Sequence, residues 1–191
     1  MPPKAKFTRE QIVKAALDIV ERDGADALTA RALGQALKSS ARPIFTVFDS
    51  MDDVRAAAVA AAKSVYAEYV ARGLAETPAF KGVGTEYIRF AAEKPKLFRL
   101  LFMSERDGAT DVNTVLGAID DSAPAILQSV IDGYSLDRDA AERLYLHLWL
   151  YAHGIAVLIA TGVCEFTAGD ISDMLTSVFV GMLAREREKN L

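Results

Sequence analysis

The chain has 191 residues, of which 51% are hydrophobic and 25% charged, and its formal net charge is −4 at pH 7. This length and composition predict a soluble globular protein with a sizeable core, in one domain or two small ones. A single cysteine excludes a disulfide within the chain. Positive charge is concentrated near the N-terminus, where residues 1–55 hold nine Lys or Arg against eight Asp or Glu.

The first helix is predicted from a local start signal and a local stop signal. Thr8 followed by Gln11 forms a capping box, and Gly24 suits the position just past a helix end. Between them, apolar residues recur at helical spacing: Ile12, Ala15, Ala16, Ile19 and Val20. One face of this helix is therefore predicted to be buried.

Two short helices are predicted to follow. Thr29 can cap the second, whose inward residues are expected to be Ala32, Leu33, Ala36 and Leu37. After a polar turn, a third helix is predicted over residues 41–48, because Pro43 is tolerated in a first turn. Ile44 and Phe48 are expected to face inward. A short exposed helix held in this way suits the DNA major groove.

The same residues carry a resemblance spread over nearly the whole segment. The matching positions are Ala15-Ala16, Gly24, Leu28-Thr29, Arg31, Leu33, Ala36 and the closing Phe45-Thr46-Val47-Phe48. Residues 8–55 resemble the DNA-binding domain of TetR-family transcriptional repressors. The resemblance implies a helix-turn-helix with these DNA-contacting residues: Lys6, Thr29, Arg31, Lys38, Ser39, Ser40, Ala41, Arg42, Pro43, Phe45 and Thr46.

Four positions depart from the family pattern. Phe45 stands where the family usually has Tyr, Val47 where it has His, Met51 where it has Lys, and Lys38 where a turn glycine is common. The first three changes remove polar contacts of the kind that set affinity and register on DNA. Either this chain binds DNA through a different set of contacts, with Arg42 reaching a base edge, or its binding is weak.

Beyond residue 50 the sequence predicts further helices over about 50–74, 80–93, 96–103, 111–131 (bent near Pro124), 137–161 and from 167 onward, with a loop at Arg106-Asp107-Gly108. The predicted fold is therefore all-α with about nine helices. It is divided into a helix-turn-helix DNA-binding domain at residues 1–50 and an effector-binding and dimerisation domain at residues 51–191.

Residues 144–164 contain no Asp, Glu, Lys or Arg, and are long enough to span a bilayer. They also contain two histidines and two glycines. A helix that is apolar all round can instead be buried between layers of protein, and this reading is preferred. Residues 1–6 have no apolar core, so no signal peptide is visible, and a cytoplasmic location without membrane contact is expected.

The C-terminal region carries a second resemblance. Trp149-x-x-x-His153-Gly154, with Leu158, Gly162 and the segment 94–102, is similar to one branch of the same family. The resemblance implies a homodimer and a small-molecule effector. The predicted effector-binding residues are Tyr66, Phe90, Phe98, Phe102, Met103, Trp149 and His153. The predicted dimer interface comprises Leu148, Ala152, Ile155, Ile159, Met174, Leu175, Val178, Phe179 and Met182. For any one of these aromatic residues, ordinary core packing is preferred over ligand contact, and His153 is preferred as a simple buried, hydrogen-bonded histidine over an effector sensor.

An enzyme is not predicted, and neither is a cofactor or a metal. Two histidines and scattered acids give no metal-ligand spacing. Gly82 and Gly84 lack the strand and lysine of a phosphate-binding loop. The sequence predicts a ligand-responsive homodimeric repressor that releases its double-stranded DNA operator when a small molecule binds. The alternative is an all-α ligand- or protein-binding dimer whose degenerate helix-turn-helix no longer binds an operator.

Overall fold

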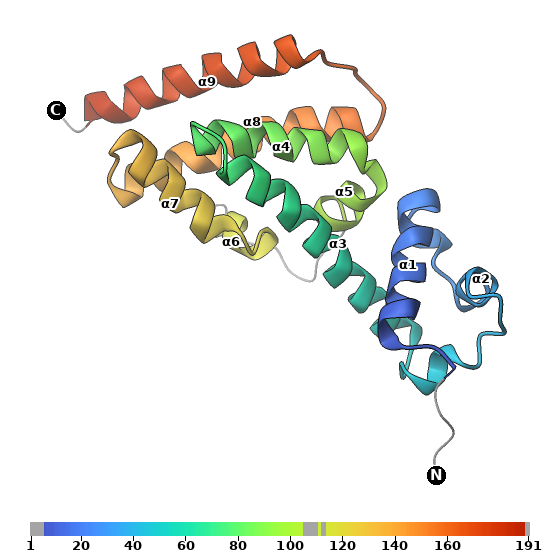
Figure 1. Cartoon of the computed structure of the whole chain (residues 1–191). Helices are drawn as coiled ribbons and strands as arrows, with labels where there is room; N and C mark the ends of the chain where they lie inside the picture. The colour runs from blue at the N-terminus through green and yellow to red at the C-terminus, as the bar shows by residue number, and fades with distance from the viewer. Residues whose placement is uncertain (1–5, 105–110, 112–113, 190–191) are drawn as a thin grey trace. The chain divides into compact units, whose positions relative to one another are not determined.

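The computed structural model describes residues 6–104, 111 and 114–189, and the regular elements in these residues are all helical (Figure 1). The predicted all-α class is confirmed, with nine α-helices and two short 3-10 helices in the described part of the chain. The helices pack into two units. Unit 1 comprises Met1–Tyr66 and Lys94–Ser104, and unit 2 comprises Ala67–Glu93 and Glu105–Leu191.

Unit 1 begins with α1 (Arg9–Asp23), which starts and ends where the sequence predicts. The Thr8 hydroxyl accepts from the Gln11 backbone N–H at 3.3 Å, and the Gln11 side chain accepts from the Thr8 N–H at 2.9 Å. Gly24 ends the helix with φ +95°, a conformation that a residue with a Cβ rarely adopts. The buried face consists of Ile12, Ala16, Ile19 and Val20.

The short 3-10 helix η1 (Ala25–Ala27) leads to α2 (Ala30–Ala36). Thr29 caps α2, because its hydroxyl accepts a hydrogen bond from the Ala32 N–H at 3.1 Å. Leu33 and Gly34 are buried in this helix. Ala36, which was expected to face inward, is exposed, because α2 ends there and its last residue has no neighbour over it.

The predicted third helix is wrong in its extent. Only Ile44–Thr46 is helical, as the 3-10 turn η2. An α-helix would need the Val47 N–H to bind the Pro43 carbonyl, but that carbonyl accepts from the Thr46 hydroxyl at 2.7 Å and the Thr46 N–H at 3.3 Å. The Val47 N–H turns back to Ile44 instead. This local side-chain bond competes with α-helical pairing and leaves a single tight turn.

Two further helices belong to unit 1. The first part of α3 (Met51–Leu74) starts at Ser50, whose hydroxyl accepts from the Asp53 N–H at 3.1 Å. Helix α5 (Pro95–Phe102) packs against α1. The Lys94 ammonium pairs with Glu21, and the Lys96 ammonium donates to the Arg22 carbonyl. α5 is thus fixed to the C-terminal end of α1.

Unit 2 is built around α8 (Arg138–Ala160), which packs against α4 (Ala79–Glu93), α7 (Ala123–Tyr134) and α9 (Ala168–Lys189). Asp137 caps α8 by accepting from the Ala140 N–H at 2.8 Å, and Thr167 with Asp170 caps α9, as predicted. α8 is the one helix in the described residues that is long and apolar enough to span a membrane, a test that buried core helices also pass. Nine of its residues are buried, from Ala140 to Ala160.

One predicted helix of unit 2 is divided in the structure. Residues 111–131 were expected to form one bent helix, but they contain α6 (Val115–Ile119) and the beginning of α7. The Asp120 carboxylate accepts from the Ser122 N–H at 2.8 Å, a local bond that favours a turn over helix continuation. The predicted loop at 106–108 lies outside the described residues.

The ends of α8 and α9 are held together by a buried carboxylate. Glu186 is 1% exposed, and the Arg143 guanidinium lies 2.7 Å from it, with Lys189 at 2.9 Å. The hydrogen bond from Arg143 lowers the pKa of Glu186. Since Arg143 is near the start of α8 and Glu186 near the end of α9, the two helices run antiparallel.

The division into packing units differs from the predicted division into domains at residue 50. The beginning of α3 and all of α5 belong to the same unit as α1, and α5 packs against α1, so unit 1 reaches beyond the helix-turn-helix residues. Helix α3 itself is continuous through the boundary at residue 66 (Figure 1). The functional division at residue 50 stays a prediction.

Candidate DNA-binding and effector-binding sites

The segment at residues 41–48, which is expected to contact DNA, has both exposed and buried side chains. Ile44 is 0% and Phe48 3% exposed, so these two residues fix the segment to the core of unit 1. Arg42 and Thr46 are exposed, and the Phe45 ring is 45% exposed. Ala41 and Pro43 are half-buried. The exposed set can offer a guanidinium to guanine and an aromatic ring to a thymine methyl.

The turn before this segment is tightly packed. Lys38 has φ +51°, the left-handed conformation for which the family pattern has a glycine. A Cβ placed on Gly34 would lie 3.1 Å from backbone atoms of Ser39, Ser40 and Ala41. The turn therefore rests directly on the backbone of α2. Gly34 was not singled out from the sequence, because close approach of two backbones leaves no local signal.

The remaining predicted DNA contacts gather around this turn. The Lys6 ammonium donates to the Ser39 hydroxyl at 3.0 Å, which places the N-terminal arm beside the turn. Lys38, Ser40 and Arg31 are exposed, while Thr29 uses its hydroxyl as a helix cap. The structure thus brings together Lys6, Ser39 and the turn residues.

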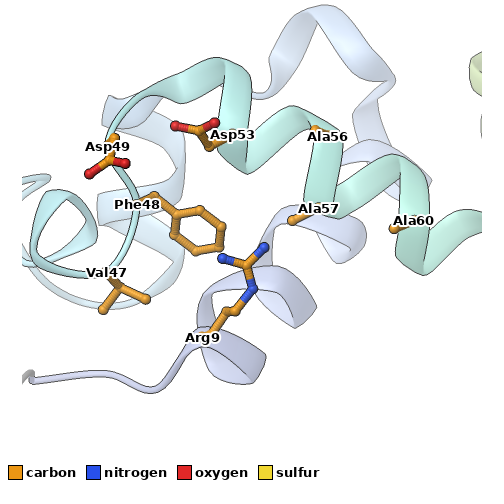
Figure 2. Close-up of a pocket in the computed structure, with 8 residues that line it drawn as sticks. All are labelled: Arg9, Val47, Phe48, Asp49, Asp53, Ala56, Ala57 and Ala60. Carbon is orange, nitrogen blue, oxygen red and sulfur yellow. The ribbon is translucent and has the colours of Figure 1, made fainter.

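Unit 1 also contains a hollow of about 380 Å³ that the sequence did not reveal (Figure 2). It is lined by Arg9, Val47, Phe48, Asp49, Asp53, Ala56, Ala57 and Ala60. The Arg9 guanidinium extends over the Phe48 ring, 4.4 Å from its centroid, and faces the alanines of α3 (Figure 2). This cation–π contact helps to hold the guanidinium over the ring.

Acidic side chains surround the start of α3. Asp49 and Asp53 line the hollow, and Asp52 pairs with Arg55 at 2.7 Å. Negative charge close to DNA phosphates weakens association. Three carboxylates, those of Asp49, Asp52 and Asp53, are thus close in sequence to Met51, where the family has lysine.

In unit 2, two half-buried residues of the Trp-x-x-x-His-Gly motif join a cluster of aromatic side chains. The Trp149 and His153 rings stack at 4.9 Å with an interplanar angle of 18°. The Tyr87 hydroxyl of α4 lies 2.8 Å from His153 Nδ1. Burial lowers the pKa of His153, so its ring is neutral near pH 7. We assign the proton of this bond to Tyr87, which leaves a proton on His153 Nε2.

Two more buried side chains belong to this cluster. Burial raises the pKa of Tyr87 far above its ordinary value; the negative charge of Asp120 adds to the rise, and the Trp149 indole N–H offsets part of it. Burial and then Asp120 raise the pKa of Tyr145 in the same way. Both hydroxyls therefore stay protonated. The cluster joins α4, α8 and the turn before α7, and sequence reasoning found only its two α8 motif residues.

The comparisons with known proteins now identify the architecture. Residues 80–182, more than half of the chain, match the family model of the tetracyclin repressor-like C-terminal domain. The chain belongs to the TetR family. It is a TetR-type transcriptional regulator, and members of this family bind DNA and dimerise.

Two relatives support the assignment of this TetR-family regulator. An HTH-type transcriptional regulator of Mycobacterium tuberculosis is 29% identical over 186 residues, covering 95% of this chain and 84% of the relative. The crystal structure of a TetR-like transcriptional regulator from Rhodococcus sp. RHA1 matches with a TM-score of 0.62 at 17% identity, over 94% of this chain and 99% of that one. The similarity to the mycobacterial regulator includes the helix-turn-helix residues. The match to the Rhodococcus structure shows a common fold.

The predicted effector residues of this TetR-family chain are distributed over both units. Tyr66, Phe98 and Phe102 pack together in unit 1, where the Phe102 ring lies 5.1 Å from Tyr66 and 5.2 Å from Phe98. Met103, also in unit 1, is 41% exposed. In unit 2, Phe90 packs edge-on against Tyr69 at 5.1 Å, and Trp149 and His153 belong to the polar cluster described above.

Four residues of the predicted dimer interface are buried within the single chain. Leu148, Ala152, Ile155 and Leu175 are all 9% exposed or less. Ile159, Met174, Val178, Phe179 and Met182 are half-buried, and the Phe179 ring packs against Tyr134 at 4.8 Å. The buried four cannot present their side chains to a second copy, because α4, α7 and α9 already surround α8. The outward apolar side chains are instead Leu150, Leu158 and Val180, at 46, 38 and 58% exposed.

Proposed function

We propose that this TetR-family regulator is a homodimeric repressor in the cytoplasm that binds double-stranded operator DNA through unit 1. A small molecule bound in unit 2 releases it. The observation that carries the proposal is the arrangement of two adjacent residues on α4. Tyr87 bonds to His153 in the aromatic cluster, and Glu86 holds the C-terminal part of α3. The same α3 continues into the DNA-binding unit.

The contact between α4 and the end of α3 is close and includes a buried carboxylate. Glu86 is 1% exposed, and its carboxylate lies 2.7 Å from the Arg72 guanidinium and also pairs with Arg89. A Cβ on Gly82 would lie 2.4 Å from the Gly73 carbonyl oxygen, so the two helices touch through their backbones. A displacement of α4 must therefore move the end of α3 with it.

Release follows if the effector and DNA prefer different positions of α4. A molecule that binds beside Tyr87 and has a higher affinity for one position of α4 shifts the population toward that position. The shift in free energy is no larger than the difference between its binding free energies for the two positions. By linkage, DNA must change effector affinity by the same factor. DNA binding is then expected to change the surroundings of Trp149, the only tryptophan in the sequence.

The experiment uses that tryptophan as a reporter and needs no effector. DNA from upstream of the regulator's own gene is titrated into the protein, and binding is followed by anisotropy of labelled DNA and by Trp149 emission. Wild type should bind with a change in emission. Glu86→Gln should bind but lose most of that change, while Glu68→Gln, on an exposed α3 residue, should behave as wild type. Equal emission changes in all three would exclude coupling through α4.

A second copy of the chain is expected to cover the outward face of α8 and α9. On α8 the exposed residues Leu150, Gly154 and Leu158 recur at helical spacing, and on α9 Val180 lies beside Gly181. A Cβ on either glycine would meet no atom within 4 Å of the same chain, so both leave space for a closely packed partner. A two-fold dimer also places two reading units on successive major grooves.

Sedimentation velocity tests this face. Leu158→Glu introduces a charge into the expected interface and should convert a dimer into a monomer over the micromolar range. Leu146→Glu is no suitable control, since Leu146 is half-buried. Ala125→Glu, at an exposed position of α7, serves better because that helix is not part of the expected interface. An unchanged dimer in Leu158→Glu would move the interface elsewhere.

A second function has specific observations in its favour. Phe45, Val47 and Met51 lack the family's polar groups, and Asp49 and Asp53 add negative charge beside them. The chain could then be a ligand- or protein-binding dimer that no longer binds an operator. The triple variant Phe45→Tyr, Val47→His, Met51→Lys discriminates. Binding gained from an undetectable baseline supports this alternative, and little change supports a different set of DNA contacts.

A further inference from the structure

Phe45 is the only exposed aromatic side chain among the residues that the structure describes, and its exposed fraction is 45%. It lies in η2, on a segment that the buried side chains of Ile44 and Phe48 fix to the core of unit 1. A single exposed apolar side chain is common on protein surfaces. The surroundings of Phe45 must therefore identify what the ring contacts.

The sequence around Phe45 is cationic. Residues 27–48 contain no Asp or Glu, and their charged residues are Arg31, Lys38 and Arg42. All three side chains are exposed, and none of them forms an ion pair within the described residues. Lysine is depleted at the centre of protein–protein interfaces, whereas free cationic side chains match the phosphates of DNA. The charge of the segment thus favours DNA as the partner of the ring.

Arg42 and Phe45 are presented together. Backbone hydrogen bonds join the N–H groups of Ile44 and Thr46 to the carbonyl three residues before each, at 3.1 and 3.3 Å. In turns of this kind, side chains three positions apart lie over one another, so Arg42 and Phe45 share a face. Three residues advance by about 6 Å, which is close to the roughly 7 Å of two base-pair steps. The two side chains can therefore reach bases about two positions apart.

Few side chains of this segment can form hydrogen bonds to bases. In residues 41–48 only Arg42 and Thr46 have polar side-chain atoms. The Thr46 hydroxyl donates to the Pro43 carbonyl at 2.7 Å, so its one hydrogen is already used. Arg42 suits guanine, and the remaining exposed group is the Phe45 ring. The apolar group that base pairs present in the major groove is the C5-methyl of thymine.

We infer that Phe45 determines operator specificity by packing on a thymine C5-methyl, and that each operator half-site has this thymine within about two base pairs of a guanine bound by Arg42. The inference rests on the proposed function, because it requires operator binding. It adds which bases the operator contains and which group of the thymine is recognised. The methyl group, and not a hydrogen bond, distinguishes thymine at this position.

Selection from a pool of random DNA duplexes by the purified full-length protein supplies the probe. A recurrent motif with guanine and thymine close together in each half-site is expected. Each thymine of the motif is then replaced by uracil in both half-sites, a change that removes only the methyl group, and affinity is measured by anisotropy at low salt. Burial of one methyl corresponds to about fourfold in affinity, so one such replacement should weaken binding about fifteenfold over two half-sites.

A second pair of duplexes isolates the methyl group from the rest of the base. At the position identified by uracil, cytosine paired with guanine replaces thymine paired with adenine. Binding should weaken, and 5-methylcytosine in place of cytosine should recover about fifteenfold, because its methyl group occupies the same place in the major groove. Equal binding of cytosine and 5-methylcytosine would contradict recognition of the methyl group alone.

Two variants assign the contact to Phe45. Phe45→Ala removes the ring and should bind the thymine and uracil duplexes equally. Arg42→Lys keeps the ring and the charge but lacks the planar guanidinium, so it should bind both duplexes more weakly and keep the ratio between them. Thermal unfolding verifies that both variants are folded, which is expected because both side chains are exposed.

The outcomes separate the inference from the proposed function. If no motif is enriched in the selection, operator binding fails and the inference fails with it. If a motif is enriched but uracil at every thymine leaves the affinity unchanged, the inference fails and operator binding stands. The same holds if Phe45→Ala keeps the preference for thymine over uracil, because another residue then recognises the methyl group.

Discussion

Replacing Glu86 by glutamine should loosen α4 from α3 and destabilise unit 2. The carboxylate is 1% exposed and pairs with both Arg72 and Arg89. Removing one partner from a buried ion pair costs about 3–5 kcal/mol when both charges are buried. Here the two arginine side chains are 48% and 49% exposed and can return to water, so we expect about 1–3 kcal/mol.

Urea denaturation at neutral pH, with Trp149 emission and far-ultraviolet circular dichroism as signals, measures this loss. A loss of about 2 kcal/mol should lower the melting temperature by roughly 4–8 °C in a chain of this size. Glu68→Gln removes an equivalent exposed carboxylate from α3 and should change stability by less than about 0.5 kcal/mol. Equal stability of wild type and Glu86→Gln would refute the claim that this carboxylate fastens α4 to α3.

Three other perturbations test separate parts of the structure by thermal or urea unfolding. Gly34→Ala places a Cβ 3.1 Å from backbone atoms and should lower the free energy of unfolding by about 1–3 kcal/mol. Gly133→Ala, whose Cβ would meet no atom within 4 Å, should be neutral or slightly stabilising. Equal effects of the two substitutions would contradict the close packing of the turn. Lys38→Gly relieves a left-handed φ of +51° and should stabilise by up to about 1 kcal/mol, a gain that Lys38→Ala should not reproduce. The folded-state pKa of Glu186 is lowered from 4.5, so the ionised carboxylate stabilises the fold above that pH, and this stabilisation is lost as pH falls below it. Glu186→Gln should therefore be less stable than wild type at pH 7, and the difference in stability should shrink toward pH 3.

Helix boundaries were predictable wherever a local signal sets them. Thr8, Thr29, Asp137 and Thr167 each cap a helix by accepting from the backbone N–H three residues ahead, and each was recognised from the sequence. The third helix failed for the same kind of reason. The bond from the Thr46 hydroxyl to the Pro43 carbonyl is also local, but it opposes the helical pattern, and residue periodicity does not weigh one against the other.

The candidate sites depend on contacts between distant residues, which periodicity cannot supply. Tyr87 bonds to His153 from 66 positions away, and nothing in its own segment marks it as a polar partner. The dimer residues show the converse problem. Leu148, Ala152 and Ile155 form a correct apolar stripe, but a stripe has the same spacing whether α4 or a second copy covers it.

Binding of the purified regulator to DNA from upstream of its own gene is the most direct test of the central claim. Fluorescence anisotropy over a salt series, with scrambled DNA of equal length as competitor, measures both specificity and the number of phosphate contacts. The account predicts preferential binding by a dimer, with affinity falling steeply as salt rises. Weak binding that is equal for both DNAs, together with recovery of specific binding in the Phe45→Tyr, Val47→His, Met51→Lys variant, would contradict it and establish a degenerate helix-turn-helix.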